Sequence, residues 1–138
     1  MNWGSNGGWN DATRGVFPDW LEVSFAGERT ISEIRVVTLQ DNFKQPQTPT
    51  PEMIATIYGI TDFDIQTWNG QQWVTVPNGS VAGNDRVMRV FNFPAVSTSK
   101  IRLQINSARS YFSRVIEFEA YSCTNPDPTP TPTPTPTP

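Results

Sequence analysis

The sequence contains no histidine, which excludes several classes of enzyme at once. Histidine is the usual general base near neutral pH, the commonest metal ligand and the group that activates most serine and cysteine nucleophiles. An enzymatic site would have to depend on carboxylates, and the close pairs are Asp62 with Asp64 and Glu117 with Glu119. A spacing of two places both members of a pair on the solvent face of a strand, where no burial raises the pKa of a general acid. We therefore expect no enzyme.

Cysteine, long apolar runs and clustered positive charge are scarce as well. Cys123 is the single cysteine, so no intramolecular disulfide can form, and the thiol is either unpaired or joined to another chain. No apolar run approaches the roughly 18 residues of a membrane span, and no basic and then apolar segment opens the chain as a signal peptide would. The net charge is -3 and the basic residues are scattered singly, which makes nucleic acid a poor partner.

The composition divides the 138 residues into one domain and a tail. Residues 1–123 are long enough for one domain with a substantial core and too short for two. Residues 124–138 are mostly alternating threonine and proline and have no side chain that could fill a core. Such a segment is expected to be an extended, semi-rigid linker in the polyproline II conformation.

Residues 100–121 contain two clear strand patterns. Ile101, Leu103 and Ile105 alternate with polar residues, and the same period of two recurs over residues 115–121. Both strands therefore offer one apolar face to a core. The connecting residues 106–114 contain too few apolar side chains to build a core of their own, so this loop is the first place to look for a binding function.

The rest of the chain also favours short strands. Further strands are expected at residues 22–25, 31–39, 53–60, 62–68, 72–76 and 86–93. We expect a tight turn over residues 26–29, a type I′ hairpin turn with Asn69 and Gly70 at its centre, a loop over residues 77–85, and the end of a strand at Pro94. Residues 41–52 hold three prolines and form a long loop. No segment has helical period, so the fold class is an all-β sandwich.

Two segments carry a family resemblance. The pattern IRL, a loop and then SRVIEFEAY resembles the closing hairpin of the discoidin-like family, the coagulation factor five/eight type C domains, which includes many bacterial carbohydrate-binding modules. Upstream, WLEVSF followed by ISEIRV is similar to another segment of that family. The resemblance spans residues 9–121. It implies a galactose-binding-like jelly-roll β-sandwich of eight strands that binds its ligand through loops at one end.

The same resemblance implies a non-catalytic recognition or adhesion module, extracellular or at the cell surface, with carbohydrate as the expected ligand. Sugars offer apolar C–H faces to aromatic rings and hydroxyl groups to guanidinium donors. The expected ligand-binding residues are Arg109, Tyr111, Phe112, Phe43, Trp3 and Trp9. The alternatives are that the loop aromatics pack onto the rim of the sandwich and that the arginine is solvated. Lipid is a rival ligand, since aromatic loop tips can insert into a membrane surface, and the acidic balance of the chain disfavours anionic lipid.

A calcium ion is also implied by the family, whose members hold it with a loop near the first strands and a glutamate in the last strand. Calcium takes six to eight oxygen ligands, many of them backbone carbonyls. The residues expected to contribute are Asp11, Thr13 and Glu117, with Asn10 and Glu119 as further candidates.

A second class of function, that of a structural subunit, involves the Thr-Pro tail. If the first strand of the family is absent, we expect an exposed sheet edge that invites a strand from another chain. In an extended strand, successive residues direct their backbone groups to opposite edges. Because threonine and proline alternate strictly, all prolines, which have no N–H, face one edge of the tail. The threonines keep their N–H donors on the other edge, and they are Thr129, Thr131, Thr133, Thr135 and Thr137. Docking of the tail on a neighbour would be heterologous and could build a filament, whereas the alternative is a free or O-glycosylated spacer.

Overall fold

A computed structural model describes residues 8–122 with their side chains and the backbone of residues 136–137. Trp3, Cys123 and residues 124–135 lie outside the described residues. The elements are β1 (Trp9–Asn10), β2 (Asp19–Thr38), β3 (Ile60–Trp68), β4 (Trp73–Val81), β5 (Met88–Ala108), a 3-10 turn η1 (Arg109–Tyr111), β6 (Arg114–Tyr121) and β7 (Pro136–Thr137). The expected all-β class is confirmed. Within the described part of the chain, no helix is long and apolar enough to cross a membrane.

Strand β2 is one continuous strand where the sequence predicted two strands and a tight turn. Its pairing with β5 is interrupted between Ser24 and Arg29, where the register shifts and the strand bends. Gly27 lies in this bend with a φ of 93°, a conformation that glycine adopts at no steric cost. The bend carries the chain from one layer of the sandwich to the other without ending the strand.

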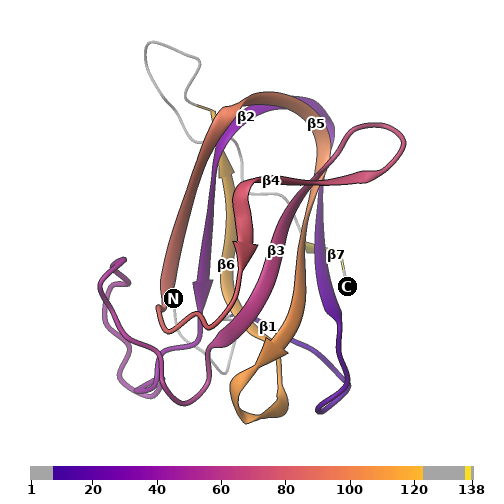
Figure 1. Cartoon of the computed structure of the whole chain (residues 1–138). Coiled ribbons are helices and arrows are strands. Elements are labelled where there is room, and N and C mark those ends of the chain that lie inside the picture. Colours follow the sequence, from indigo (N-terminus) through magenta and orange to yellow (C-terminus); the bar gives the residue numbers. More distant parts are fainter. Residues whose placement is uncertain (1–7, 123–135, 138) are drawn as a thin grey trace.

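Strand β5 likewise joins two predicted strands, and the expectation that Pro94 ends the first of them is wrong. Asn92 pairs with Glu33 and Val96 pairs with Ile31, so Pro94 lies in a local irregularity of the ladder. There its missing N–H costs no regular hydrogen bond. Because β2 and β5 are antiparallel neighbours and bend together, both arch over the same end of the molecule (Figure 1).

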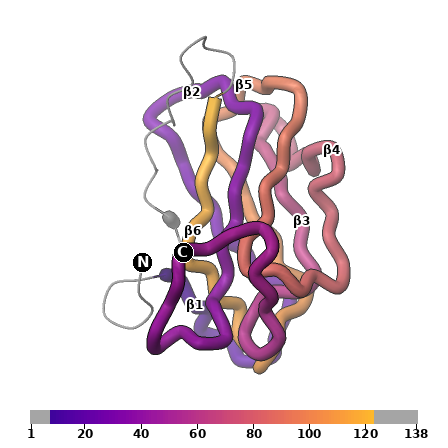
Figure 2. Tube along the Cα trace, turned by 90° about the vertical axis from the view of Figure 1, so that its left-hand side faces the viewer, coloured from indigo at the N-terminus to yellow at the C-terminus, as the bar shows by residue number. Residues whose placement is uncertain are grey.

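The two arching strands divide the sheet into two facing layers, in the order β1-β6-β2-β5-β3-β4. One layer holds β1, β6, the second half of β2 and the first half of β5. The other layer holds the first half of β2, the second half of β5, β3 and β4, with β7 on the edge of β2 (Figures 1 and 2). The strands that begin at residues 88 and 114 are therefore not a hairpin, because β2 lies between them and pairs with both.

The core fills the space between these layers with side chains from both. Ile101, Leu103 and Ile105 of β5 are fully buried, as their alternation predicted. They pack with residues of the other strands, chiefly Leu21, Val23, Ile31, Ile34, Val36, Phe63, Ile65, Phe91, Val115 and Phe118. At roughly 1.5–3 kcal/mol for each large apolar side chain that leaves water, this burial is the main stabilising contribution.

The strand expected over residues 53–60 does not form. Ile54 makes only an isolated bridge with Arg86. The N–H of Ala55 donates to the carbonyl of Asp85 at 2.8 Å. The N–H groups of Thr56 and Ile57 donate to the carboxylate of Asp41 and not to a neighbouring strand. A side chain that satisfies backbone donors in this way competes with sheet pairing.

A hairpin connection follows Trp68, as predicted, and Trp68 pairs with Trp73 across it. The type I′ turn expected there is wrong, because it needs positive φ at both Asn69 and Gly70 and only Gly70 has it, at 97°. The N–H of Asn69 donates to the carbonyl of Gln72 at 3.1 Å. The side chain of Asn69 accepts from the N–H groups of Gln71 and Gln72. Farther along, residues 77–80 lie within β4 as an irregularity of the β3–β4 ladder.

Candidate functional site

Three loops meet at the end of the sandwich opposite the two arches (Figure 1). They follow β1, β2 and β5, and backbone contacts join them. The N–H of Gly15 donates to the carbonyl of Tyr111 at 2.7 Å, and the N–H of Arg109 donates to the carbonyl of Gly59 at 2.9 Å. The hydroxyl of Ser110 donates to the carbonyl of Ile57 at 2.7 Å. The loops therefore form one continuous surface.

The last of these loops has a constrained backbone. Ser110 and Tyr111 both have positive φ, 57° and 68°, which is uncommon for residues other than glycine. Strain of this kind persists only where surrounding contacts fix it, and it is found more often at binding sites than elsewhere. Here it leaves the side chain of Tyr111 59% exposed, beside the guanidinium of Arg14 at 4.8 Å from the ring centroid.

Three aromatic rings from two of these loops form a chain of contacts that includes one arginine. The ring of Phe43 meets the ring of Tyr58 edge-on at 5.4 Å. The guanidinium of Arg114 lies over Tyr58 and over Phe112, at 5.2 Å from each ring centroid. We call Phe43, Tyr58, Phe112 and Arg114 the end cluster. The structure thus brings together Phe43 and Phe112, two of the predicted ligand contacts, through two residues that the sequence reasoning missed.

Arg109 lies next to this cluster but contacts none of its rings in the described structure. Its charge acts on the carboxylate of Asp41, which also accepts hydrogen bonds from Thr56 and Ile57. Partial burial would raise the pKa of Asp41, but these hydrogen bonds and the charge of Arg109 together lower it. Asp41 is therefore a fixed negative charge that holds residues 56–57 against the loop of Arg109.

Two of the arginines at this end keep unused donor capacity. The Nε of Arg109 and the Nη1 of Arg114 are buried and have no hydrogen-bond partner among the described residues. Burial lowers the pKa of Arg114 from its usual value, while Tyr58 and Asp11 oppose the shift. Because a guanidinium stays protonated in proteins, Arg114 remains a cation among aromatic rings.

A polar network ties the first loop to the start of β6. Asp11 accepts from the N–H of Thr13 at 3.0 Å and from the N–H of Ser113 at 2.6 Å. Asp19 accepts from the hydroxyl of Ser113 at 2.7 Å, and burial is the main reason that its pKa is raised. Beside this network is an open hollow of about 410 Å³, lined by residues that include Trp9 and Trp20.

Trp9 packs against the core while it lines this hollow, and it contacts no member of the end cluster in the described structure. Packing on the sandwich rim was the alternative expected for this residue. Its role as a ligand contact stays a prediction.

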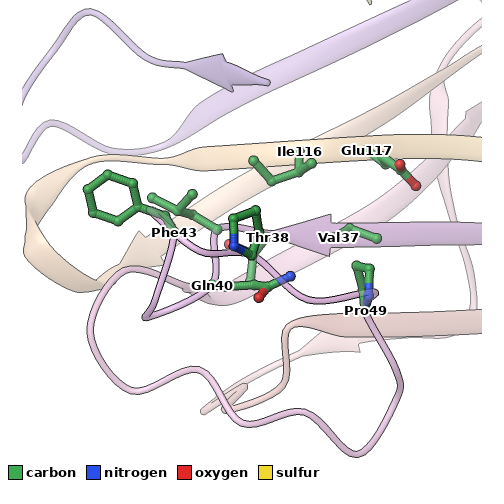
Figure 3. Close-up of a pocket in the computed structure, with 9 residues that line it drawn as sticks. Val37, Thr38, Gln40, Phe43, Pro49, Ile116 and Glu117 are labelled. Carbon is green, nitrogen blue, oxygen red and sulfur yellow. The ribbon is translucent and has the colours of Figure 1, made fainter. Parts of the chain in front are cut away.

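The residues expected to bind calcium are only partly brought together. Asp11 and Thr13 are hydrogen-bonded neighbours, and the Asp11 oxygens already accept from protein donors. Glu117 of β6 is paired with Val37 of β2 and lines a different cavity, together with Phe43 (Figure 3). No group of three or more acidic, cysteine or histidine side chains is placed to hold a metal among the residues that the structure describes. The observed arrangement does not fit the predicted calcium set, and a calcium ion there stays an untested expectation.

The cavity of Glu117 is too small for a sugar. Its volume is about 30 Å³, which is room for roughly one water molecule. Phe43, Ile116 and Pro49 contribute apolar walls (Figure 3). The expectation that Glu117 lies on a solvent face without burial is wrong, because burial raises its pKa and the neighbouring Glu119 raises it further. This cavity lies at the base of the loop that carries Phe43.

Comparison with known proteins identifies the fold. No family model matches the sequence, and no curated protein matches it. Among solved structures, the chain is similar to chitosan-binding module 1 of a chitosanase/glucanase from Paenibacillus sp. IK-5, with a TM-score of 0.64, 19% identity, and coverage of 87% of this chain and 80% of that chain. Chitosan-binding module 2 of the same enzyme, solved in complex with chitotriose, gives a TM-score of 0.61 and 18% identity over 82% of this chain and 77% of that chain.

The third comparison is the family 32 carbohydrate-binding module of Clostridium perfringens NanJ, solved in complex with galactose. It gives a TM-score of 0.58 and 15% identity over 82% of this chain and 74% of that chain. All three identities are low, so the likeness concerns the architecture. This chain has the discoidin-like, galactose-binding-like β-sandwich fold that these modules share.

Proposed function

We propose that this protein is a non-catalytic carbohydrate-binding module of an extracellular or cell-surface protein, and that it binds through the end cluster together with Tyr111, Arg14 and Arg109. The observation that carries the proposal is the contact of Arg114 with Tyr58 and Phe112 at the loop end, with Phe43 packed edge-on against Tyr58. The similar solved modules include some in complex with chitotriose and with galactose, which supports carbohydrate as the ligand class.

The chemistry of this end matches what a sugar presents. An aromatic ring packs on the apolar C–H face of a pyranose, and guanidinium groups donate to its hydroxyl oxygens. Tyr111 is the most accessible of these rings. Of the end cluster, Phe43 lines the cavity of about 30 Å³, which is too small for a sugar, so we expect the sugar to bind on the surface with a small contact area. For a monosaccharide of about 12 non-hydrogen atoms at roughly 0.3 kcal/mol each, the expected dissociation constant is in the millimolar range.

The charge of this end favours neutral or acidic sugars over cationic ones. Three guanidinium groups, those of Arg14, Arg109 and Arg114, lie at the loop end. Two carboxylates lie near them, and both are already engaged. Asp41 accepts from Thr56 and Ile57 and feels the charge of Arg109, and Asp11, which acts on Arg114, accepts from the N–H groups of Thr13 and Ser113. A glucosamine oligomer would place its ammonium groups against these cations, and like charges at short range repel. We therefore expect galactose-type neutral sugars to bind better than chitotriose.

The test is a glycan array followed by calorimetry with galactose and with chitotriose. Tyr111→Ala and Arg114→Met are expected to weaken binding at least tenfold. Gln71→Ala changes an exposed residue of the hairpin beyond β3 and should leave binding unchanged. Unaltered binding by both loop variants would move the site elsewhere. No binding to any glycan, or hydrolysis of a bound glycan, would reject the proposal.

A second candidate function, that of a structural subunit, is favoured by one specific observation. The end of the Thr-Pro tail, β7, pairs with an edge of β2. This contact lies outside the end cluster, so the two functions do not compete for the same residues.

A further inference from the structure

The first half of β2 has a sheet edge that the body of the domain does not cover. Residues 19–24 pair with β5 along one edge. The partner on the opposite side of β2, strand β6, pairs only with residues 33–38. Among the described strands, the second edge of residues 19–24 is met by β7 alone, where Thr137 pairs with Glu22 and Pro136 pairs with Val23 (Figure 1).

The Thr-Pro sequence suits this edge in spite of its prolines. Proline has no N–H, so only the threonines of the tail can donate to β2. In an extended strand, residues two apart direct their backbone groups to the same side, so every threonine of the alternating tail shares the edge of Thr137. On β2, the matching residues are Trp20, Glu22 and Ser24. A displacement of the tail by two residues restores the same arrangement, so the repeat can pair along the whole edge in several registers.

The surface beside this edge fits an extended proline-rich strand. Because β7 is antiparallel to β2, the tail runs from Val23 toward Trp20. Trp20 is 51% exposed, and with Pro18 and Trp9 it lines the hollow of about 410 Å³. Grooves lined by aromatic rings are the usual receptors for proline-rich segments. A tail paired over more of the edge would cover this exposed tryptophan.

The length of the tail argues for a partner outside its own domain. Strand β6 ends at Tyr121, opposite Glu33 and close to the bend of β2, and facing sheet layers are only about 10 Å apart. Residues 122–135, fourteen in all, join Tyr121 to Pro136 and can span up to about 46 Å. A domain of this size is roughly 35 Å across. The connection is therefore much longer than a crossing to its own edge requires, and long enough to reach a neighbouring domain.

We infer that the edge formed by Trp20, Glu22 and Ser24 is an acceptor for the Thr-Pro tail of a second copy of this chain, and that the pairing within one chain is the same contact made intramolecularly. Each copy then offers one donor tail and one acceptor edge at different places. Such a contact is heterologous, and where its rotation does not close a ring it continues into a filament. This inference is independent of the proposed sugar site.

The first test compares the whole chain with a chain that ends at Ser122, by light scattering and electron microscopy over a range of concentrations. The whole chain should form oligomers or filaments, and the truncated chain should be monomeric. In the tail, Thr133→Pro with Thr135→Pro removes two donors and should abolish assembly. Thr133→Val with Thr135→Val keeps the N–H groups and should preserve it. If both double variants lost assembly equally, the threonine side chains and not their N–H groups would be responsible. That result would overturn the proposed backbone pairing of the tail with β2.

The decisive test separates donor from acceptor. Ser24→Pro removes an edge donor from an exposed residue of β2, with Ser24→Ala as its control, and circular dichroism verifies that each variant folds. The Ser24→Pro chain, which keeps its tail, is mixed with the chain truncated after Ser122, which keeps its edge. Neither should assemble alone, whereas the mixture should give a one-to-one complex. Absence of that complex, or assembly of the truncated chain by itself, would overturn the inference.

Discussion

Replacement of Asp41 by asparagine should destabilise the loop that supports the end cluster. The carboxylate accepts from the N–H and the hydroxyl of Thr56, at 2.9 Å and 2.7 Å, and from the N–H of Ile57 at 2.8 Å. Asparagine keeps the shape but presents an NH₂ group to these donors and has no charge. The backbone donors would then be only partly satisfied, and Tyr58, the next residue, would lose its fixed position.

The magnitude follows from the number and the exposure of these bonds. A hydrogen bond to a charged group contributes about 1.5–3 kcal/mol, but these groups are partly exposed to water, so we expect a loss of about 2 kcal/mol in the free energy of unfolding. At about 4 °C per kcal/mol for a domain of this size, Asp41→Asn should lower Tm by about 8 °C. The matched control is Asp85→Asn, which changes the same chemistry at a solvent-exposed ion pair with Arg86 and should shift Tm by about 2 °C or less.

The pH dependence gives an independent check. The pKa of Asp41 is lowered in the folded protein, so its contribution to stability is fully present above the unfolded value of about 3.9. The contribution is lost as the pH falls below that value and through the folded pKa. Thermal melts monitored by circular dichroism at pH 7, 4 and 2.5 should show the difference between wild type and Asp41→Asn shrinking in the acidic range. A difference that is equal at all three values, or no larger than that of the control, would refute the reasoning.

Two further predictions concern other parts of the sandwich. Gly79→Ala would place a Cβ 2.5 Å from the Cγ2 of Val76 and 2.9 Å from its carbonyl oxygen, so urea denaturation should show a loss of about 1–3 kcal/mol; an unchanged midpoint would show that β4 relaxes at no cost. Burial, with the hydrogen bond to Glu119, raises the pKa of Tyr121 to about 12, so absorbance titration should show one tyrosine ionising late. Tyr121→Phe should remove that phase and no other.

The sequence was sufficient for the fold class but not for the continuity of the two longest strands. Strict alternation at Ile101, Leu103 and Ile105 identified a half-buried strand, because burial on one face is a local property of the pattern. The bend between Ser24 and Arg29 is not local. It depends on β5, which bends beside β2 over the same stretch. The local sequence does not distinguish a tight turn from a bulged strand, because both accept similar residues.

The site was predicted in part for a similar reason. Phe43 and Phe112 stood out because each is a large aromatic residue in a loop. Arg114 and Tyr58 did not stand out, since both lay in or beside segments that the pattern assigned to strands. Their contact joins residues more than fifty positions apart and depends on Asp41, which prevents residues 56–57 from pairing as a strand. Nothing in the local pattern around residue 58 predicts that outcome.

The two proposed surfaces would reinforce each other. The sugar site is at the loop end, where a small contact area limits the affinity of a single domain to the millimolar range. The acceptor edge begins near the bend at the opposite end, where β7 pairs with Glu22 and Val23. Subunits joined tail to edge would repeat the end cluster along the assembly, and linked weak sites can exceed the affinity of one site by a factor of about 10²–10⁴. A single shallow site therefore does not need high affinity for the assembly to stay bound to a glycan-coated surface.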